Sequence, residues 1–140
     1  RRELQSRWSP AERRNLATLG KETNDFFSQF PFKMPNQALT GTTELFNVNY
    51  LAFGGRRDFV HTPFRVLVAG CATGAHALIL AAQMESLDFH ALSKVVCLDQ
   101  SQASLALAKR RIAEQNLSHR VVYWHASLLD VKEEHGRFDY

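Results

Sequence analysis

One stretch, residues 65–82, constrains the fold of this chain more than any other. Residues 66–69 are continuously apolar, Gly70 and Gly74 follow, and apolar residues then recur at helical spacing through residue 81. This order predicts a buried parallel strand, a tight glycine turn and a helix. Because the first N–H groups of a helix have no partner inside it, we expect them to face outward and to receive a polar ligand.

Two further apolar runs end at residues that belong to the same predicted edge of a sheet. Residues 95–98 end in Asp99, and residues 121–124 lead to His125. Ligands of open α/β sheets bind at the carboxyl ends of the strands, and an acid at the tip of the second strand is placed to accept hydrogen bonds from ribose hydroxyls. The alternatives are a plain strand–helix connection for the glycine turn and a helix-start acid for Asp99, a role compatible with ribose binding.

In this order, the segments resemble the motifs of class I S-adenosylmethionine-dependent methyltransferases. The first motif of that family, V-L-D-x-G-C-G-T-G, is similar to residues 66–74, and the acidic second motif corresponds to Asp99. The third, adenine-contacting motif resembles residues 126–129, and the fourth, which begins F-D, resembles residues 138–140. The resemblance covers about residues 65–140 and implies S-adenosyl-L-methionine as the cofactor.

The resemblance also implies which residues hold the cofactor. Ser127 stands where the family often has an Asp that accepts from the adenine amino group, and the N–H of Leu128 is placed to bond an adenine nitrogen; an ordinary loop serine is the alternative. The residues expected to contact the cofactor are Ala69, Gly70, Cys71, Ala72, Thr73, Gly74, Asp99, Gln100, Ala126, Ser127 and Leu128.

Two residues of the first motif depart from the family pattern. Val68 stands where the family usually has an acid that helps to orient the amino group of the cofactor. Ala72 stands where the family usually has a middle glycine. We expect the turn to absorb the extra methyl group with Ala72 at a negative φ, which is the allowed side for a non-glycine residue.

The order of elements predicts an α/β fold, a Rossmann-like doubly wound parallel sheet truncated after the start of strand four, with an N-terminal helical lead-in. The predicted strands lie near residues 65–69, 94–98, 120–124 and 137–140, and a helix capped by Ser101 runs to about Asn116. The resemblance implies that strand one lies between strands two and four.

We expect residues 1–60 to form the lead-in and residues 61–140 to form the N-terminal half of a methyltransferase domain, so the chain is interpreted as a fragment. Helix-start, glycine and proline signals predict lead-in helices over residues 9–19 and 22–30, and a third that ends at Phe53. The connection from Arg56 to Pro63 is expected to be extended.

Composition limits the classes of partner. The formal net charge is +3, and the early basic residues are interleaved with acids, which favours a solvated helix face over a nucleic-acid interface. We expect no membrane-spanning segment, because no run reaches about 18 apolar residues. The two cysteines form no CxxC pair, so we expect free thiols, no structural zinc and a cytoplasmic location.

The histidines and one arginine pair are weaker candidates for a site. The six histidines show no metal-ligand spacing, so no metal site is expected. His76, in the first turn of the glycine-turn helix, is interpreted as a neutral bystander. Arg56 and Arg57 precede strand one, where a guanidinium can clamp a carboxylate, but a solvated pair in a linker is the favoured interpretation.

The leading hypothesis is an S-adenosylmethionine-dependent methyltransferase that acts on an unknown acceptor, with any base that activates the acceptor beyond Tyr140 or in the lead-in. One alternative is a nicotinamide-dependent Rossmann oxidoreductase, which requires a glycine where Ala72 stands so that the pyrophosphate can approach. Another is a non-catalytic methyltransferase-like module, which Val68, Ala72 and Ser127 favour.

Overall fold

The computed structural model of the chain describes residues 58–140 continuously, together with residues 9–11, 14, 18, 21, 22, 25 and 54. In the lead-in, residues 10, 11, 14, 18, 21, 22 and 25 are helical. The ends of the predicted lead-in helices, the predicted helix that ends at Phe53, and the pair Arg56 and Arg57 lie outside the described residues. Within the described part of the chain, no helix is long and apolar enough to cross a membrane.

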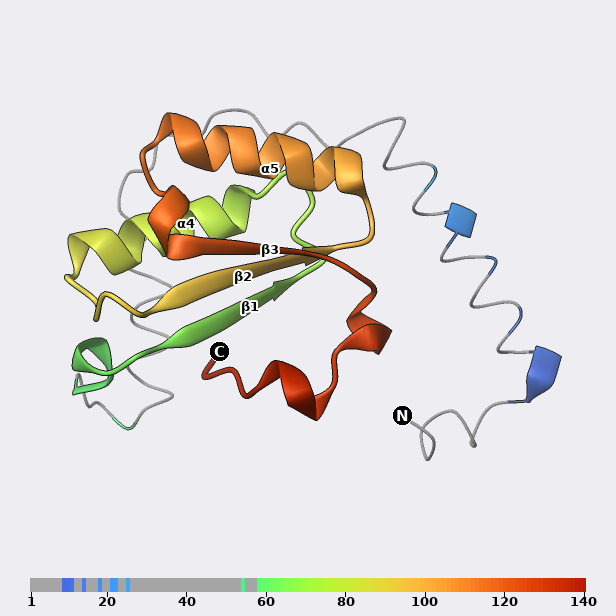
Figure 1. Cartoon of the computed structure of the whole chain (residues 1–140), viewed down its shortest axis with the longest axis horizontal. Helices are drawn as coiled ribbons and strands as arrows, with labels where there is room; N and C mark the ends of the chain where they lie inside the picture. Colours follow the sequence, from blue (N-terminus) through green and yellow to red (C-terminus); the bar gives the residue numbers. More distant parts are fainter. Residues whose placement is uncertain are drawn as a thin grey trace.

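Three parallel strands form one sheet in the order β1-β2-β3, with bounds Arg65–Ala69, Lys94–Asp99 and Val121–His125. The crossover helices α4 (Ala75–Ser86) and α5 (Gln102–Glu114) lie together on one face of this sheet (Figure 1). This confirms the predicted Rossmann-like α/β fold, with strand bounds that differ by one residue at β2 and β3 from the prediction.

The main core lies between this face of the sheet and the two helices. The register places Val66 opposite Val95, and Val95 opposite Val121, so these side chains share the face that meets α4 and α5. Both helices bring small or branched side chains to the same cluster, namely Ala77, Leu80, Ala81, Leu105 and Ile112. Strand β2 is buried on both faces, with Val95–Leu98 at most 2% exposed, which explains its continuously apolar sequence.

The approach to β1 is not the extended connection that the sequence predicts. Residues Asp58–His61 form a short 3-10 helix, η1, that places Phe59 against the amino end of the sheet. The ring centroid of Phe59 lies 5.4 Å from that of Phe64 and 5.8 Å from that of Phe89. Burial of these three rings makes a turn more favourable here than an extended segment, since aromatic clusters contribute large buried areas.

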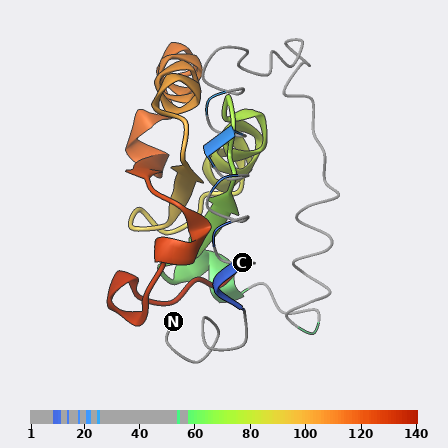
Figure 2. The ribbon, with the colours of Figure 1, turned by 90° about the vertical axis from the view of Figure 1, so that its right-hand side faces the viewer.

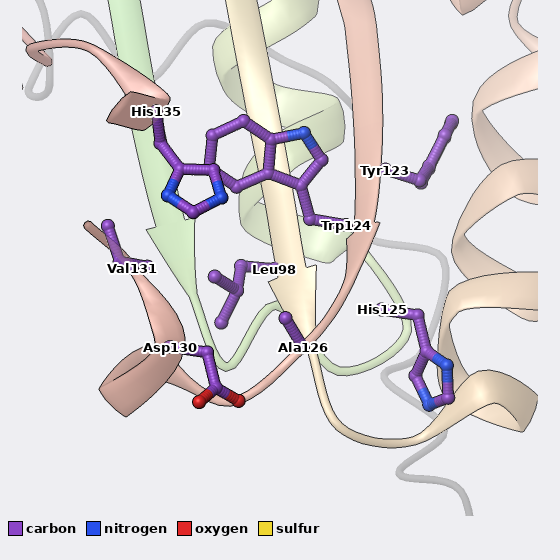
Figure 3. Close-up of a pocket in the computed structure, with 8 residues that line it drawn as sticks. All are labelled: Leu98, Tyr123, Trp124, His125, Ala126, Asp130, Val131 and His135. Atoms are coloured by element: carbon purple, nitrogen blue, oxygen red, sulfur yellow. The ribbon is translucent and has the colours of Figure 1, made fainter. Parts of the chain in front are cut away.

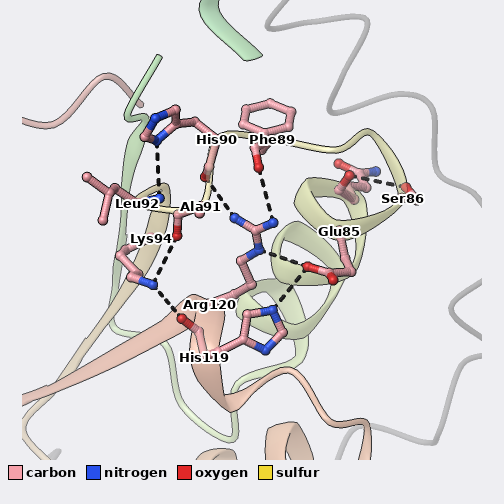
Figure 4. Close-up of polar contacts among 10 residues, drawn as sticks. Glu85, Ser86, Phe89, His90, Ala91, Leu92, Lys94, His119 and Arg120 are labelled. Atoms are coloured by element: carbon pink, nitrogen blue, oxygen red, sulfur yellow. Dashed lines mark hydrogen bonds and ion pairs between the residues drawn. The ribbon is translucent and has the colours of Figure 1, made fainter. Parts of the chain in front are cut away.

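A buried arginine closes the amino end of the sheet (Figure 4). Arg120 is 6% exposed and belongs to the 3-10 helix η2 (Ser118–Arg120), so β3 begins one residue later than predicted. Its guanidinium donates to Glu85 Oε2 at 2.9 Å and to the carbonyls of Phe89 and His90 at 3.1 and 2.9 Å. The partners satisfy the buried cation, and the contacts tie the end of α4 to the start of β3.

The segment after β3 crosses to the other face of the sheet, opposite α4 and α5, and contains the 3-10 helices η3 (Leu128–Asp130) and η4 (Glu133–His135) (Figures 1 and 2). The predicted strand over residues 137–140 is not formed, but the segment pairs with β1. Leu67 N–H donates to the Tyr140 carbonyl at 2.8 Å, and Asp139 accepts from the Arg65 N–H at 2.8 Å. These bonds place β1 between β2 and this segment, as the family resemblance implies.

The Arg65 guanidinium holds this segment. Its Cζ lies 4.7 Å from the ring centroid of Phe138, and its terminal nitrogens donate to the carbonyls of His135 and Arg137 at 3.1 and 3.2 Å. A Cβ at Gly136 would lie 2.5 Å from Arg65 Nη1. The residues Phe138 and Asp139 of the fourth motif therefore have a packing role beside the first strand.

Candidate cofactor site at the carboxyl ends of the strands

The glycine turn is formed by three residues in the left-handed region. Gly70, Ala72 and Gly74 have φ values of 66°, 47° and 79°. The expectation of a negative φ at Ala72 is wrong. The left-handed conformation crowds Cβ against the backbone, so Ala72 carries a strain of about 1–2 kcal/mol that a glycine would avoid.

Four N–H groups of the turn are bonded within the fold. The outward-facing donors expected at the helix start are the first N–H groups of α4, at Ala75, His76 and Ala77, and these have no hydrogen bond among the described residues, so that expectation stays a prediction. Gly70 and Cys71 N–H both donate to the Leu98 carbonyl, at 2.8 and 3.0 Å. Gly74 N–H donates to the Cys71 carbonyl at 2.9 Å, and Ala72 N–H donates to Asp99 Oδ2 at 2.8 Å. The bonds of Gly70, Cys71 and Ala72 fasten the turn to the end of β2, and the Gly74 bond closes the turn on itself, so none of these four donors is available to a phosphate.

Asp99 lies at the tip of β2, as predicted, and is half-buried. Besides Ala72, its carboxylate accepts from the N–H of Ser101 at 2.8 Å, through Oδ1. Two ionised carboxylate oxygens offer about four lone-pair positions, and the two backbone bonds use one on each oxygen. Asp99 therefore positions the turn and keeps acceptor capacity for a further hydroxyl donor.

The end of β3 completes the edge next to Asp99. Ala126 N–H donates to the Asp99 carbonyl at 3.1 Å, and His125 Nε2 lies 2.9 Å from the Gln100 carbonyl. Asp99, Gln100 and Ala126, which the sequence assigned to one site, are thus brought together. His125 was not assigned to it, because its partner is a backbone carbonyl that carries no signal in the sequence.

Ser127 has a local structural role. Its hydroxyl accepts from the Leu129 N–H at 3.2 Å, and its own N–H donates to Asp130 Oδ2 at 3.4 Å, which caps the 3-10 helix η3. The Ser127 hydroxyl can still donate one hydrogen bond. Leu128 follows and is 53% exposed. It is the first residue of η3, and the N–H groups at the start of a helix lack a partner within the helix.

The two glycines of the turn face different surroundings. A Cβ at Gly74 would lie 2.7 Å from the Ala108 Cβ, so α5 touches the backbone here. A Cβ at Gly70 would have no atom of the described residues within 4 Å, apart from its chain neighbours. Among the described residues, the space over Gly70 is therefore open, next to the exposed Ala69 and two residues before Ala72, whose N–H the Asp99 carboxylate accepts.

Two of the predicted contact residues have side chains that turn inward. Thr73 is 3% exposed and Cys71 is 7% exposed. Both residues are buried as a whole, so their contact with a cofactor stays a prediction.

The two thiols lie next to each other beneath the turn. A hydrogen bond with Cys71, together with burial and the nearby charge of Asp99, raises the pKa of the Cys97 thiol strongly. Burial and the two thiols also raise the pKa of Tyr123 to about 12. The Tyr123 hydroxyl is buried and has no hydrogen-bond partner among the described residues. The Cys97 thiol and the Tyr123 hydroxyl are therefore neutral at physiological pH.

A cavity of about 330 Å³ lies on the opposite face of the sheet, under the segment after β3 (Figure 3). Trp124 and His135 lie together at one end, with ring centroids 5.0 Å apart, and Asp130 lies at the other. Of the residues expected to bind the cofactor, only Ala126 lines it. No sequence pattern predicts this cavity, because it depends on how the loop after β3 folds back.

Comparison with known proteins supports the fold and identifies a family. The model of a family described as a methyltransferase domain matches residues 66–140, more than half of the chain. Among solved structures, the chain is similar to the [4+2]-cyclase SpnF, with a TM-score of 0.52 and 18% sequence identity over 80% of this chain and 44% of that one. The chain thus spans less than half of that structure, and the likeness concerns the fold alone. No curated protein matches the chain. The match over residues 66–140 shows that this chain belongs to the methyltransferase domain family.

Proposed function

We propose that this chain binds S-adenosyl-L-methionine at the carboxyl ends of β1 and β2, as part of a methyltransferase. The observation that carries the proposal is the Asp99 carboxylate at the tip of β2, next to the open side of the turn at Gly70. A carboxylate with unused acceptor positions beside open space suits the two hydroxyls of a ribose. Membership of the methyltransferase domain family supports the same ligand.

Each end of the edge has a separate task in this proposal. Asp99 accepts a ribose hydroxyl, Gly70 leaves room for the chain that carries the sulfur, and the Ser127 hydroxyl or the Leu128 N–H contacts the adenine. When bound, S-adenosylmethionine supplies an activated methyl group on its sulfonium, so the protein contributes mainly binding and alignment. The described residues leave the methyl acceptor open.

The directions of the turn donors disfavour a nicotinamide dinucleotide. A pyrophosphate needs outward N–H groups at the turn and the helix start. Here the N–H groups of Gly70, Cys71, Ala72 and Gly74 are bonded within the fold, which leaves only the first N–H groups of α4 as donors to a phosphate at this edge. S-adenosylmethionine has no pyrophosphate and does not require these donors.

A module that keeps the fold without methyl transfer is the second candidate. It is favoured by Val68, which packs against the core where the family usually has an acid, and by the strained Ala72. The similarity to a protein named as a cyclase shows that this fold also occurs under another activity. Cofactor binding without transfer to any acceptor would support this candidate.

The test of the proposal is calorimetric titration of the chain with S-adenosylmethionine, S-adenosylhomocysteine and NAD. We expect binding of the first two and none of NAD. Asp99→Asn should weaken the binding of S-adenosylhomocysteine by about ten- to a hundredfold, because a hydrogen bond to a charged group contributes about 1.5–3 kcal/mol. Asp88→Asn, at the other end of the sheet, is the matched control and should leave the affinity unchanged.

A change in the ligand separates ribose binding from the role of Asp99 in holding the turn. A 2′-deoxy or 3′-deoxy analogue of S-adenosylhomocysteine should bind more weakly than the parent compound to the wild type. The same analogue should bind no more weakly than the parent to Asp99→Asn. An equal loss in both proteins would contradict a ribose contact by Asp99, and no binding to the wild type would contradict the proposed function.

A further inference from the structure

A residue of α5 contacts the glycine turn at Thr73, next to the Ala72 that Asp99 holds. The Arg111 Nη1 donates to the Thr73 carbonyl at 3.1 Å and to Thr73 Oγ1 at 3.2 Å. Thr73 is 3% exposed and stands between Ala72 and Gly74, two residues in the left-handed region. One guanidinium nitrogen thus fixes both the backbone and the side chain of the central part of the turn.

We propose that Arg111 is a positioning residue for the cofactor site. The left-handed conformation of Ala72 is unfavourable for a residue with a Cβ, so the turn keeps its shape only if its neighbours hold it. Asp99 holds Ala72 through its N–H, and Arg111 holds the next residue. Asp99 ends β2, and Arg111 lies in α5, which begins three residues later at Gln102. The stretch from residue 99 to residue 111 therefore carries both contacts.

This role is specific to Arg111 within its basic cluster. Lys109 and Arg110 are exposed, and Arg110 pairs with Glu114 at 3.0 Å, four residues along the same helix. Among the described residues, neither side chain forms a hydrogen bond or ion pair with the turn. The sequence places all three residues in one basic run, and only the packing of α5 on Gly74, through Ala108, brings Arg111 to Thr73.

The contact holds the turn in place without touching the ligand. If the contact between Arg111 and Thr73 is lost, the hydrogen bond from the Ala72 N–H to Asp99 opens more often. The turn conformation that leaves the space at Gly70 open is then populated for a smaller fraction of the time. A ligand then binds with an affinity reduced by that fraction. The inference depends on the proposed function for its effect on affinity, but the effect on the turn itself does not.

The experiment compares Arg111→Ala, Arg111→Lys and the matched control Arg110→Ala in the full chain. Three quantities are measured: the dissociation constant of S-adenosylhomocysteine, the melting temperature, and hydrogen exchange at the Ala72 N–H. We expect Arg111→Ala to weaken binding by about tenfold and to lose protection at Ala72, with partial recovery in Arg111→Lys. Arg110→Ala should change neither the dissociation constant nor the hydrogen exchange at Ala72.

A second substitution tests the strain directly. Ala72→Gly relieves the left-handed strain, so Arg111→Ala should cost less affinity in that background than in the wild type. Affinity within twofold of wild type in Arg111→Ala, or a lower melting temperature with an unchanged dissociation constant, would overturn the positioning role. If the wild type binds no S-adenosylhomocysteine, the proposed function fails, and exchange at Ala72 in Arg111→Ala against Arg110→Ala then decides the inference.

Discussion

Replacing Gly74 by Ala tests the idea that α5 packs directly on the glycine turn. The new Cβ would lie 2.7 Å from the Ala108 Cβ and 3.1 Å from its Cα, and Gly74 has a φ of 79°. The left-handed φ costs about 1–2 kcal/mol for a residue with a Cβ. Forcing a methyl group into packed surroundings costs about 1–3 kcal/mol more. We therefore expect Gly74→Ala to lower the free energy of unfolding by about 2–5 kcal/mol, a large share of the stability of a domain.

Gly70→Ala is the matched control for this change. Its φ of 66° is similar, but its Cβ would meet nothing within 4 Å among the described residues. Only the conformational cost applies, so we expect a loss of about 1–2 kcal/mol in stability. Under the proposed function, Gly70→Ala should also weaken the binding of S-adenosylhomocysteine, because the Cβ of the new alanine would project into the space that the ligand occupies.

Urea unfolding followed by tryptophan fluorescence measures both effects. Ala108→Gly alone should cost about 1 kcal/mol as a glycine inside a helix. In the Gly74→Ala background it should cost less or even stabilise, because it removes the overlapping Cβ, and the coupling energy should exceed about 0.5 kcal/mol. Equal losses for Gly70→Ala and Gly74→Ala, or strictly additive effects of Gly74→Ala and Ala108→Gly, would refute the close packing.

Two further substitutions test groups that the structure buries. Tyr123→Phe should stabilise the protein by about 1 kcal/mol, because it removes a buried hydroxyl without a partner among the described residues. Since the folded pKa of Tyr123 is raised to about 12, wild-type stability should be complete below the unfolded value near 10 and should fall as pH rises toward 12. Tyr123→Phe should reduce this fall in pH-dependent urea titrations, and an unchanged slope would contradict the burial of the hydroxyl. Arg120→Met should lower the free energy of unfolding by about 2–4 kcal/mol, because the carbonyls of Phe89 and His90 lose their donor. Glu85→Gln should cost much less, because that carboxylate is half exposed. Thermal or urea unfolding measures both losses, and similar values for the two variants would contradict this reasoning.

The positions of the strands could be predicted because burial dictates their composition, whereas their order was implied by the family resemblance. The runs that became β1 and β2 are apolar at successive positions, and such runs occur where a parallel strand is covered on both faces. The start of β3 lies one residue later than predicted, since Arg120 satisfies its charge in the turn before the strand. That choice depends on Glu85 and on two carbonyls distant in sequence, which no local pattern reports.

The site residues could be located from the sequence, but the directions of their polar groups could not. Spacing predicts where a strand ends and therefore that Asp99 and Ala126 meet. It does not predict that the turn donors point toward Leu98 and Asp99, or that Ala72 takes a positive φ. Those directions follow from the pairing of the turn with β2 and from the packing of α5, which are both tertiary.

The residues of the motifs serve the fold as well as the proposed ligand. Asp99 holds two backbone N–H groups, Gly74 admits α5, Ser127 caps a 3-10 helix, and Gly70 adopts a left-handed φ. A chain that had lost its cofactor would still need these residues to fold. For this reason a substitution in the protein changes folding and binding together, whereas removal of a ribose hydroxyl from the ligand leaves the folded protein unaltered. The affinity lost on that removal, and its disappearance in Asp99→Asn, isolates the contribution of the site to binding from its contribution to stability.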